Sequence, residues 1–240
     1  MTILPHPFDH KEAIALLSKA DPHLARLIEK TMEFRLNIDE EQSPYESLLR
    51  AIVYQSISGK VAAVIFSRIK ALGPNGRCPT PEELLRVRKP ALRKAGLSGA
   101  KVAAVRDLAQ KTIAGVVPAI EEAHRMSDRE LVERLISVRG IGAWTVEMFL
   151  IFRLGRPDVL PIHDYGVQKG FALTYRKRRI PKPRELEKFG ERWRPYRTVA
   201  SWYLWRAVEL AGKDGRKITK KRIAVKNVKK PAIRKKQKPV

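Results

Sequence analysis

The sequence has little that could cross-link the chain through sulfur or metal. Cys78 is the one cysteine among 240 residues, whereas a disulfide or a cysteine-ligated zinc or iron–sulfur site needs several. The histidines offer no substitute, because His6, His10, His23 and His124 do not show the spacing of zinc ligands. A disulfide framework and a zinc or iron–sulfur site of these kinds are therefore excluded within the chain.

Long apolar runs are also missing. Residues Met1 to Pro7 lack the charged segment and apolar stretch of a secretory signal peptide. No other run approaches the roughly 20 apolar residues that span a bilayer. We expect a soluble, intracellular protein with no membrane partner.

Acidic residues are scarce relative to basic ones. The chain has 25 Asp and Glu against 49 Lys and Arg, a formal net charge of +24. The tail from Lys213 to Val240 has 13 basic residues and one acidic residue, and the remainder has 36 and 24. An excess in both parts predicts a polyanionic partner, with nucleic acid favoured over a membrane. A ribosomal-type or merely soluble basic protein would explain the tail but not the motifs of the body.

The alternation typical of β-strands is absent, as is any repeat at a solenoid-like period. Helix-start residues recur instead, at Asp9, Asp21, Ser43, Thr80 and Ser127. We expect an all-α protein of about ten helices, the last covering about 195–211 and ending at Gly212. Residues 213–240 have too few apolar side chains to fold alone and are expected to be a disordered basic tail.

A turn with two glycines, Gly140-Ile-Gly142, separates two predicted helices. The first begins at the capping box Ser127–Glu130 and the second, almost wholly apolar, runs from Trp144 to Arg153. Glycines let a phosphate approach the backbone, and the free N–H groups that open the second helix can bind it. Such a hairpin holds a nucleic-acid backbone without reading its sequence.

Asp164 is the sharpest candidate for chemistry. It follows Gly142 by 22 residues, so one loop can return it beside the hairpin. An Asp that opens a helix is usually only an N-cap, and from spacing alone both interpretations stay open. For the adjacent His163 we favour a structural or solvent-facing role.

Two tryptophans of the last helix, Trp202 and Trp205, fall opposite its main apolar stripe. Packing against a neighbouring helix is the commoner outcome for such residues. Alternatively, one of them lines a cleft and offers its face to a base or a cation. Trp144, directly after the hairpin, poses the same choice.

Taken together, these motifs resemble the helix-hairpin-helix DNA glycosylases, in particular the 3-methyladenine DNA glycosylase II (AlkA-like) branch. The resemblance covers Ser43 to Gly212. It rests on the following segments: Leu135-x4-Gly140-Ile-Gly142-x-Trp144-Thr145, Asp158-Val-Leu-Pro161 with Asp164, Tyr54-Gln-Ser-Ile-Ser58, Gly96-Leu-Ser-x-x-Lys101, and Glu191-Arg-Trp-Arg-Pro-Tyr-Arg197 with Trp205.

The resemblance implies a two-lobed all-α fold with DNA across a central cleft. One lobe would cover about 43–158, and the other about 1–42 plus 159–212. We expect no counterpart of the mixed α/β domain that precedes the helices in some relatives, since helical signals begin near Asp9.

The resemblance also implies roles for single residues. Asp164 matches the essential aspartate of the family. Further positions match a base pocket (Trp144, Tyr165, Trp205), DNA contacts (Gln55, Ser56, Gly140, Gly142, Thr145) and backbone carbonyls that hold a monovalent cation, Na⁺ or K⁺ (Ile136, Val138, Gly140). No other cofactor is expected. At the position that wedges into the duplex, this chain has the polar Ser56 rather than a bulky apolar residue.

Relatives that also cut the DNA strand carry a lysine where this chain has Trp144. The resemblance therefore implies a monofunctional enzyme that flips alkylated purines out of double-stranded DNA and releases them, and we expect it to be a monomer. We expect Trp144 and Trp205 to stack on the cationic base, and ionised Asp164 to stabilise the sugar or to activate water. The alternatives are a non-catalytic DNA-binding module and a glycosylase for oxidised or deaminated bases.

Overall fold

The computed structural model describes residues 8–39 and 42–226, and within these ranges all regular secondary structure is helical, without a β-strand. Helices α1 to α7 are His10–Ala20, Pro22–Lys30, Pro44–Tyr54, Gly59–Lys70, Pro81–Arg86, Lys89–Ala95 and Gly99–Ile113. Helices α8 to α13 are Ile120–Arg125, Asp128–Leu135, Ala143–Phe152, Tyr165–Thr174, Pro183–Gly190 and Arg197–Lys226. Short 3-10 turns, η1 and η2, cover Pro74–Gly76 and Glu191–Trp193. The prediction of an all-α fold is confirmed.

The helix starts follow from local side-chain chemistry. Ser43, Thr80 and Ser127 each accept a bond from the backbone of a glutamate three residues later, and that glutamate reaches back to the cap, which completes a capping box. Asp9 and Asp21 cap α1 and α2 through their carboxylates. All five predicted helix starts are therefore confirmed.

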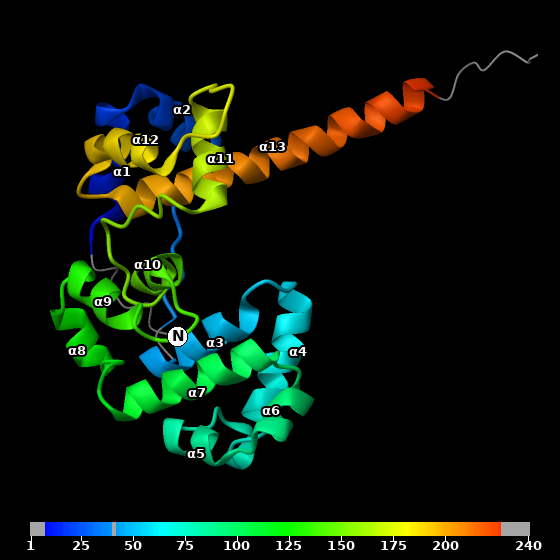
Figure 1. The fold of residues 1–240 in the computed structure, drawn as a ribbon. Helices are drawn as coiled ribbons and strands as arrows, with labels where there is room; N and C mark the ends of the chain where they lie inside the picture. Colours follow the sequence, from blue (N-terminus) through cyan, green and yellow to red (C-terminus); the bar gives the residue numbers. More distant parts are fainter. Residues whose placement is uncertain (1–7, 40–41, 227–240) are drawn as a thin grey trace, which may run out of the picture.

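The helices form two groups with α10 between them (Figure 1). Helices α3 to α9 make one group, and α1, α2, α11, α12 and the first half of α13 make the other. Their buried apolar side chains belong to one continuous cluster. This is the two-lobed arrangement that the resemblance implied, while the lobe boundaries 43–158 and 159–212 stay a prediction.

Asp21 ties the second group together. Its side chain is 2% exposed and accepts hydrogen bonds from the Tyr175 hydroxyl at 2.5 Å and from Trp193 Nε1 at 3.0 Å. It also caps α2 through the N–H groups of His23 and Leu24. The Asp21 carboxylate thus joins the start of α2 to two residues that lie more than 150 positions further along the chain.

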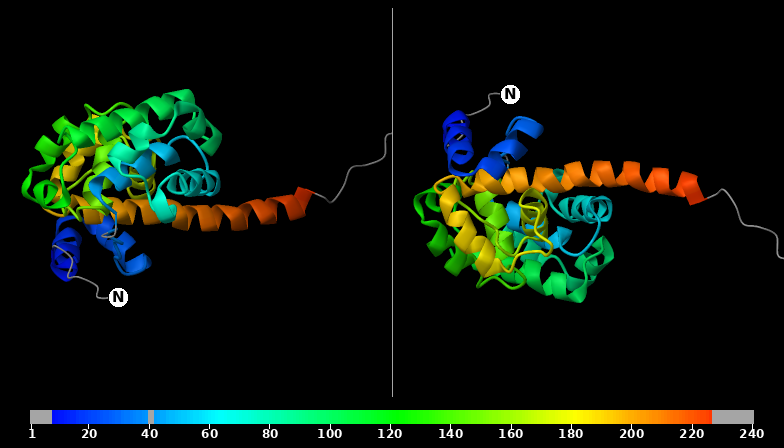
Figure 2. Two further views of the ribbon diagram at one scale, coloured as in Figure 1. Left: turned by 90° about the horizontal axis from the view of Figure 1, so that it is seen from below. Right: turned by 90° about the horizontal axis from the view of Figure 1, so that it is seen from above.

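The predicted end of the last helix at Gly212 is wrong. Helix α13 continues through Gly212 and Gly215 to Lys226 and projects from the body in all three views (Figures 1 and 2). Lysine and arginine favour helix, and an internal glycine costs about 1 kcal/mol rather than ending a helix. The rest of the predicted tail, 227–240, lies outside the described residues. Across the ranges that the structure describes, no helix is both long and apolar enough to cross a lipid bilayer.

Candidate functional site

Asp164 receives hydrogen bonds from three helices. Its Oδ2 accepts from Trp144 Nε1 of α10 at 2.8 Å. Its Oδ1 accepts from Trp205 Nε1 of α13 at 2.8 Å and from the backbone N–H of Val167 in α11, also at 2.8 Å. Asp164 is therefore the N-cap of α11 and at the same time the meeting point of two indoles. The N-cap interpretation is therefore confirmed, and the catalytic interpretation stays a prediction.

The loop that brings Asp164 back to α10 is anchored on the start of α13. Asp158 accepts from Arg197 Nε at 2.7 Å and from Arg194 Nη1 at 2.6 Å. Thr198 accepts from the Val159 N–H at 3.0 Å, and its own N–H donates to the Pro157 carbonyl at 2.9 Å. The segment between α10 and α11 is thus held at its middle, which places Asp164 opposite Trp144.

The three tryptophans considered above have different environments. Trp144 stands in the first turn of α10 and is 45% exposed. Trp205 is half-buried and stacks on Phe152, with ring centroids 5.8 Å apart. Trp202 is buried and packs edge-on against Phe34. Core packing therefore holds for Trp202, whereas Trp144 and Trp205 converge on Asp164.

Gly166 leaves the space that Trp205 occupies. A Cβ at this position would lie 2.7 Å from Trp205 Cδ1 and 3.0 Å from both Trp205 Nε1 and Asp164 Oδ1. Gly166 was not among the predicted site residues, although a glycine two positions after a candidate aspartate was a readable signal. Tyr165, between them, is 64% exposed, with the Lys169 ammonium 5.9 Å from its ring. Among the described residues, the Tyr165 hydroxyl makes no hydrogen bond to Asp164, unlike the two indoles.

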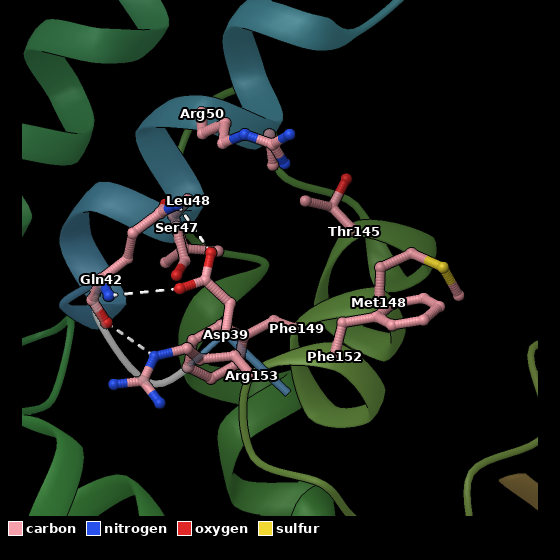
Figure 3. A pocket seen from close by; sticks show the side chains of 11 residues that line it. Asp39, Gln42, Ser47, Leu48, Arg50, Thr145, Met148, Phe149, Phe152 and Arg153 are labelled. Atoms are coloured by element: carbon pink, nitrogen blue, oxygen red, sulfur yellow. Dashed lines mark hydrogen bonds between the residues drawn. The ribbon is translucent and has the colours of Figure 1, made fainter. Parts of the chain in front are cut away.

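A cavity of about 210 Å³ lies near this cluster (Figure 3). Asp164, Trp144 and Trp205 are not among the residues that line it. It lies between the face of α10 with Thr145, Met148 and Phe152 and the face of α3 with Leu48 and Arg50. Its remaining lining residues are Asp39, Gln42, Ser47, Ala51, Phe149 and Arg153. Because Phe152 both lines the cavity and stacks on Trp205, the cavity adjoins the Asp164 cluster.

Polar residues that line the cavity are hydrogen-bonded to one another. Asp39 Oδ2 accepts from Gln42 Nε2 at 2.6 Å, and the Gln42 carbonyl accepts from Arg153 Nε at 2.6 Å (Figure 3). Thr145, which we predicted to contact DNA, has a side chain that is only 5% exposed and lines this cavity. Its N–H donates to the Gly142 carbonyl at 2.9 Å, and its contact with DNA stays a prediction.

Glu147, one turn after Trp144, is a second carboxyl near Asp164. Its Oε2 is buried without a hydrogen-bond partner. Burial, and to a lesser degree the charge of Asp164, raise the pKa of Glu147 from 4.5 to about 7. Glu147 was not among the predicted site residues, because nothing in its apolar sequence context indicates that it lies near Asp164.

The hairpin has the backbone geometry expected of it. Gly140 has φ +80°, a left-handed conformation that favours glycine. Gly142 is the N-cap of α10, and no side chain caps this helix, so its first N–H groups remain available to an anion. Gly140 also accepts a bond from Gln55 Nε2 at 2.8 Å, which joins the hairpin to the loop after α3. In that loop, the exposed Ser56 has φ +57°.

The three carbonyls predicted to hold a cation are partly engaged by protein donors. Val138 accepts from the Ile141 N–H at 3.0 Å, and Gly140 accepts from Gln55. A carbonyl oxygen has two lone pairs, so these bonds leave each of the two carbonyls one acceptor position. Together with Ile136, the set is compatible with a monovalent ion, which stays a prediction. Within the described part of the chain, no group of three or more His, Cys, Asp or Glu side chains could hold a metal ion.

Comparison with known proteins identifies the family. A family model described as "HhH-GPD superfamily base excision DNA repair protein" matches residues 49–195. DNA-3-methyladenine glycosylase 1 of Schizosaccharomyces pombe is 39% identical over 211 residues, which cover 85% of this chain and 92% of the relative.

Solved structures agree with this result. The S. pombe 3-methyladenine DNA glycosylase in complex with abasic DNA superposes with a TM-score of 0.75 at 40% identity, covering 81% of this chain and 95% of that one. A DNA-3-methyladenine glycosidase from Bacillus halodurans has a TM-score of 0.74 at 34% identity, covering 86% and 92%. The chain therefore belongs to the HhH-GPD superfamily of base excision DNA repair proteins.

Proposed function

We propose that this protein is a DNA glycosylase that hydrolyses the N-glycosidic bond of alkylated purines in double-stranded DNA. The observation that carries the proposal is the carboxylate of Asp164, held by two indole N–H groups beside a cavity and next to an anion-binding hairpin. The names of the S. pombe and B. halodurans relatives support alkylated purines over other lesions. The basic body of the chain supports a DNA partner.

The hairpin and the loop after α3 would contact the DNA first. The N–H groups that open α10 would bind a phosphate, and Gln55 and Ser56 would enter the duplex where the damaged base leaves it. Flipping a base costs a few kcal/mol, and least for a damaged pair. The exposed ring of Trp144 would then stack on the cationic purine, worth about 0.5–2 kcal/mol, while Trp205 is already stacked on Phe152.

Asp164 acts on the sugar in this proposal. The bond between C1′ and the purine nitrogen breaks with its electron pair on the base, which neutralises the positive charge of the alkylated ring. The sugar becomes oxocarbenium-like, and the negative Asp164 carboxylate stabilises it. Water then adds to C1′ and releases a proton to solvent. Three N–H donors already bind this carboxylate, which favours electrostatic stabilisation as its main role over deprotonation of water.

The enzyme should release the base without cutting the strand. Strand cleavage in related enzymes starts with a Schiff base from a lysine at the position that Trp144 fills here, and an indole cannot form one. Strand breaks that arise without alkali or heat would contradict this part of the proposal.

Carbonyl oxygens of Ile136, Val138 and Gly140 would hold a monovalent cation, which would add positive charge beside the bound phosphate. We further propose that the protein acts as a monomer, with the lobes bounded as predicted, and that it acts wherever the cell keeps its DNA.

The decisive experiment is base release from methylated duplex DNA. Wild type should release 3-methyladenine, and Asp164→Asn should lose most of this activity because a neutral amide cannot stabilise the cationic sugar. Asp9→Asn is the matched control, since Asp9 is also the N-cap of a helix but caps α1 and not α11. Binding without release by wild type would indicate a non-catalytic module. Release confined to oxidised or deaminated bases would shift the substrate class.

A further inference from the structure

One helix, α7, contacts both segments that the proposed function assigns to DNA. It packs against α3 in the first group of helices (Figure 1). Lys101, Ala104, Asp107 and Lys111 follow one another at three- or four-residue intervals, so they share one face of α7. Each of the four meets either the loop after α3 or the hairpin.

Lys101 binds the end of α3. Its Nζ donates to the carbonyls of Val53 and Gln55, both at 2.7 Å. The last carbonyls of a helix have no partner within the helix, and a cation there satisfies them and complements the helix dipole. Burial lowers the pKa of the Lys101 ammonium, in keeping with a group that faces protein rather than water.

Asp107 and Lys111 bind the hairpin. Asp107 Oδ2 accepts from the Arg139 N–H at 2.7 Å and from Lys111 Nζ at 3.0 Å. Lys111 Nζ also donates to the Ser137 carbonyl. Between these contacts, Ala104 packs so close to the turn that a Cβ on Gly140 would lie 3.2 Å from its own Cβ.

The two segments are also bonded to each other. Gln55 Nε2 donates to the Gly140 carbonyl at 2.8 Å, across 85 positions of sequence. Lys101 holds the carbonyl of this same Gln55. Helix α7, Gln55 and the hairpin are thus each hydrogen-bonded to the other two.

Ser56, next to Gln55, needs such support. Its φ of +57° is a left-handed conformation, which is unfavourable for a non-glycine residue and persists where the surroundings impose it. The hydrogen bonds of the neighbouring Gln55 to Gly140 and Lys101 restrain the backbone next to Ser56.

We propose that Lys101 and Lys111 are positioning residues, which hold the 55–58 loop and the hairpin at a fixed spacing so that both engage one DNA duplex together. The inference rests on the proposed function, because it takes duplex DNA as the ligand of both segments. The ammonium groups bind protein carbonyls and Asp107, so they act through the loops and not on phosphates.

Salt dependence separates this role from a direct phosphate contact. Each lysine that neutralises a phosphate adds about one unit to the slope of log affinity against log salt concentration. A lysine whose ammonium binds protein carbonyls and contacts no phosphate can raise DNA affinity without adding to this slope. Lys101→Met removes the donor and keeps the length of the side chain.

The experiment measures affinity for an undamaged duplex at several salt concentrations. Lys101→Met should weaken binding by about tenfold, as loss of a charge-assisted bond predicts, with an unchanged slope. Lys101→Arg, which can still donate to two carbonyls, should recover most of the affinity. Lys94→Met, at an exposed position of α6, controls for the lost charge.

A slope reduced by about one unit in Lys101→Met, or unchanged affinity, would overturn the proposal. If Lys101→Met does not fold, as judged by its thermal unfolding, Lys111→Met provides the same test on the hairpin side. The outcome is separable from that of the proposed function. Wild type that binds duplex DNA but releases no base would refute the glycosylase and leave the positioning role measurable by binding.

Discussion

The indole Nε1 of Trp144 donates a hydrogen bond to Asp164 Oδ2 over 2.8 Å. The two residues lie 20 positions apart, on either side of the loop between α10 and α11. In the proposed function Trp144 would therefore have two tasks. Its N–H would orient the carboxylate, and its ring, which is 45% exposed, would stack on a base.

Trp144→Phe separates these two tasks, because phenylalanine keeps an aromatic face and loses the N–H donor. We expect base release at saturating enzyme to slow by roughly tenfold, as loss of a bond to a charged group costs about 1.5–3 kcal/mol. DNA affinity should change little. Trp202→Phe is the control, since Trp202 packs against Phe34 and its loss should lower stability but not the rate of release. An unchanged rate in Trp144→Phe would show that the indole N–H has no part in catalysis.

Gly166→Ala tests the close approach of Trp205 to Asp164. The added Cβ would lie 2.7 Å from Trp205 Cδ1, so the indole must move and its bond to Asp164 should lengthen or break. We expect at least a tenfold loss of base release, with a smaller effect on DNA binding. Gly212→Ala, where nothing lies within 4 Å of the new Cβ, should retain full activity and gain up to about 1 kcal/mol of helix stability. Equal activity of the two variants would refute the steric requirement.

Glu147 predicts a dependence of stability on pH. Its pKa is raised from 4.5 to about 7 in the folded protein, so between these values the native state binds more protons than the unfolded state. The free energy of unfolding should then fall as the pH rises through this window. Glu147→Gln removes the ionisable carboxyl, so its free energy of unfolding should exceed that of wild type by about 1–2 kcal/mol at pH 8. This value is smaller than the full pKa shift implies, because the side chain is partly exposed to solvent.

Urea unfolding of both proteins at several pH values measures this difference. The advantage of Glu147→Gln should shrink toward pH 4.5, where the wild-type carboxyl is protonated in the folded state. A difference that stays constant between pH 4.5 and 8 would show that packing, and not ionisation, separates the two proteins.

Asp21 predicts a large loss of stability on truncation. Asp21→Ala leaves the Tyr175 hydroxyl and the Trp193 N–H without their acceptor in a buried site, and we expect a loss of about 3 kcal/mol. Asp9→Ala removes an exposed cap of α1 and should cost about 1 kcal/mol. Chemical denaturation of the two variants compares them directly, and equal losses would mean that the tertiary bonds of Asp21 contribute nothing.

The sequence by itself determined the features that depend on neighbours within a few positions. Ser43, Ser127 and Asp164 each cap a helix through the N–H three residues later, and such bonds can be read from residue spacing. The turn at Gly140-Ile-Gly142 was equally readable, because a left-handed residue favours glycine. These local rules sufficed for the fold class and for the place of the hairpin.

The tertiary structure alone decided which side chains meet. Trp205 reaches Asp164 across 41 positions, only because α11 packs closely on α13 and Gly166 leaves the indole its space. The burial of Glu147 Oε2 without a partner and the hydrogen bond from Lys101 to the Gln55 carbonyl likewise arise from packing between helices. Periodicity places a residue on a face of its helix, but the partner of that face depends on how the helices assemble. That assembly placed Trp202 in the core and made Trp205 a partner of Asp164.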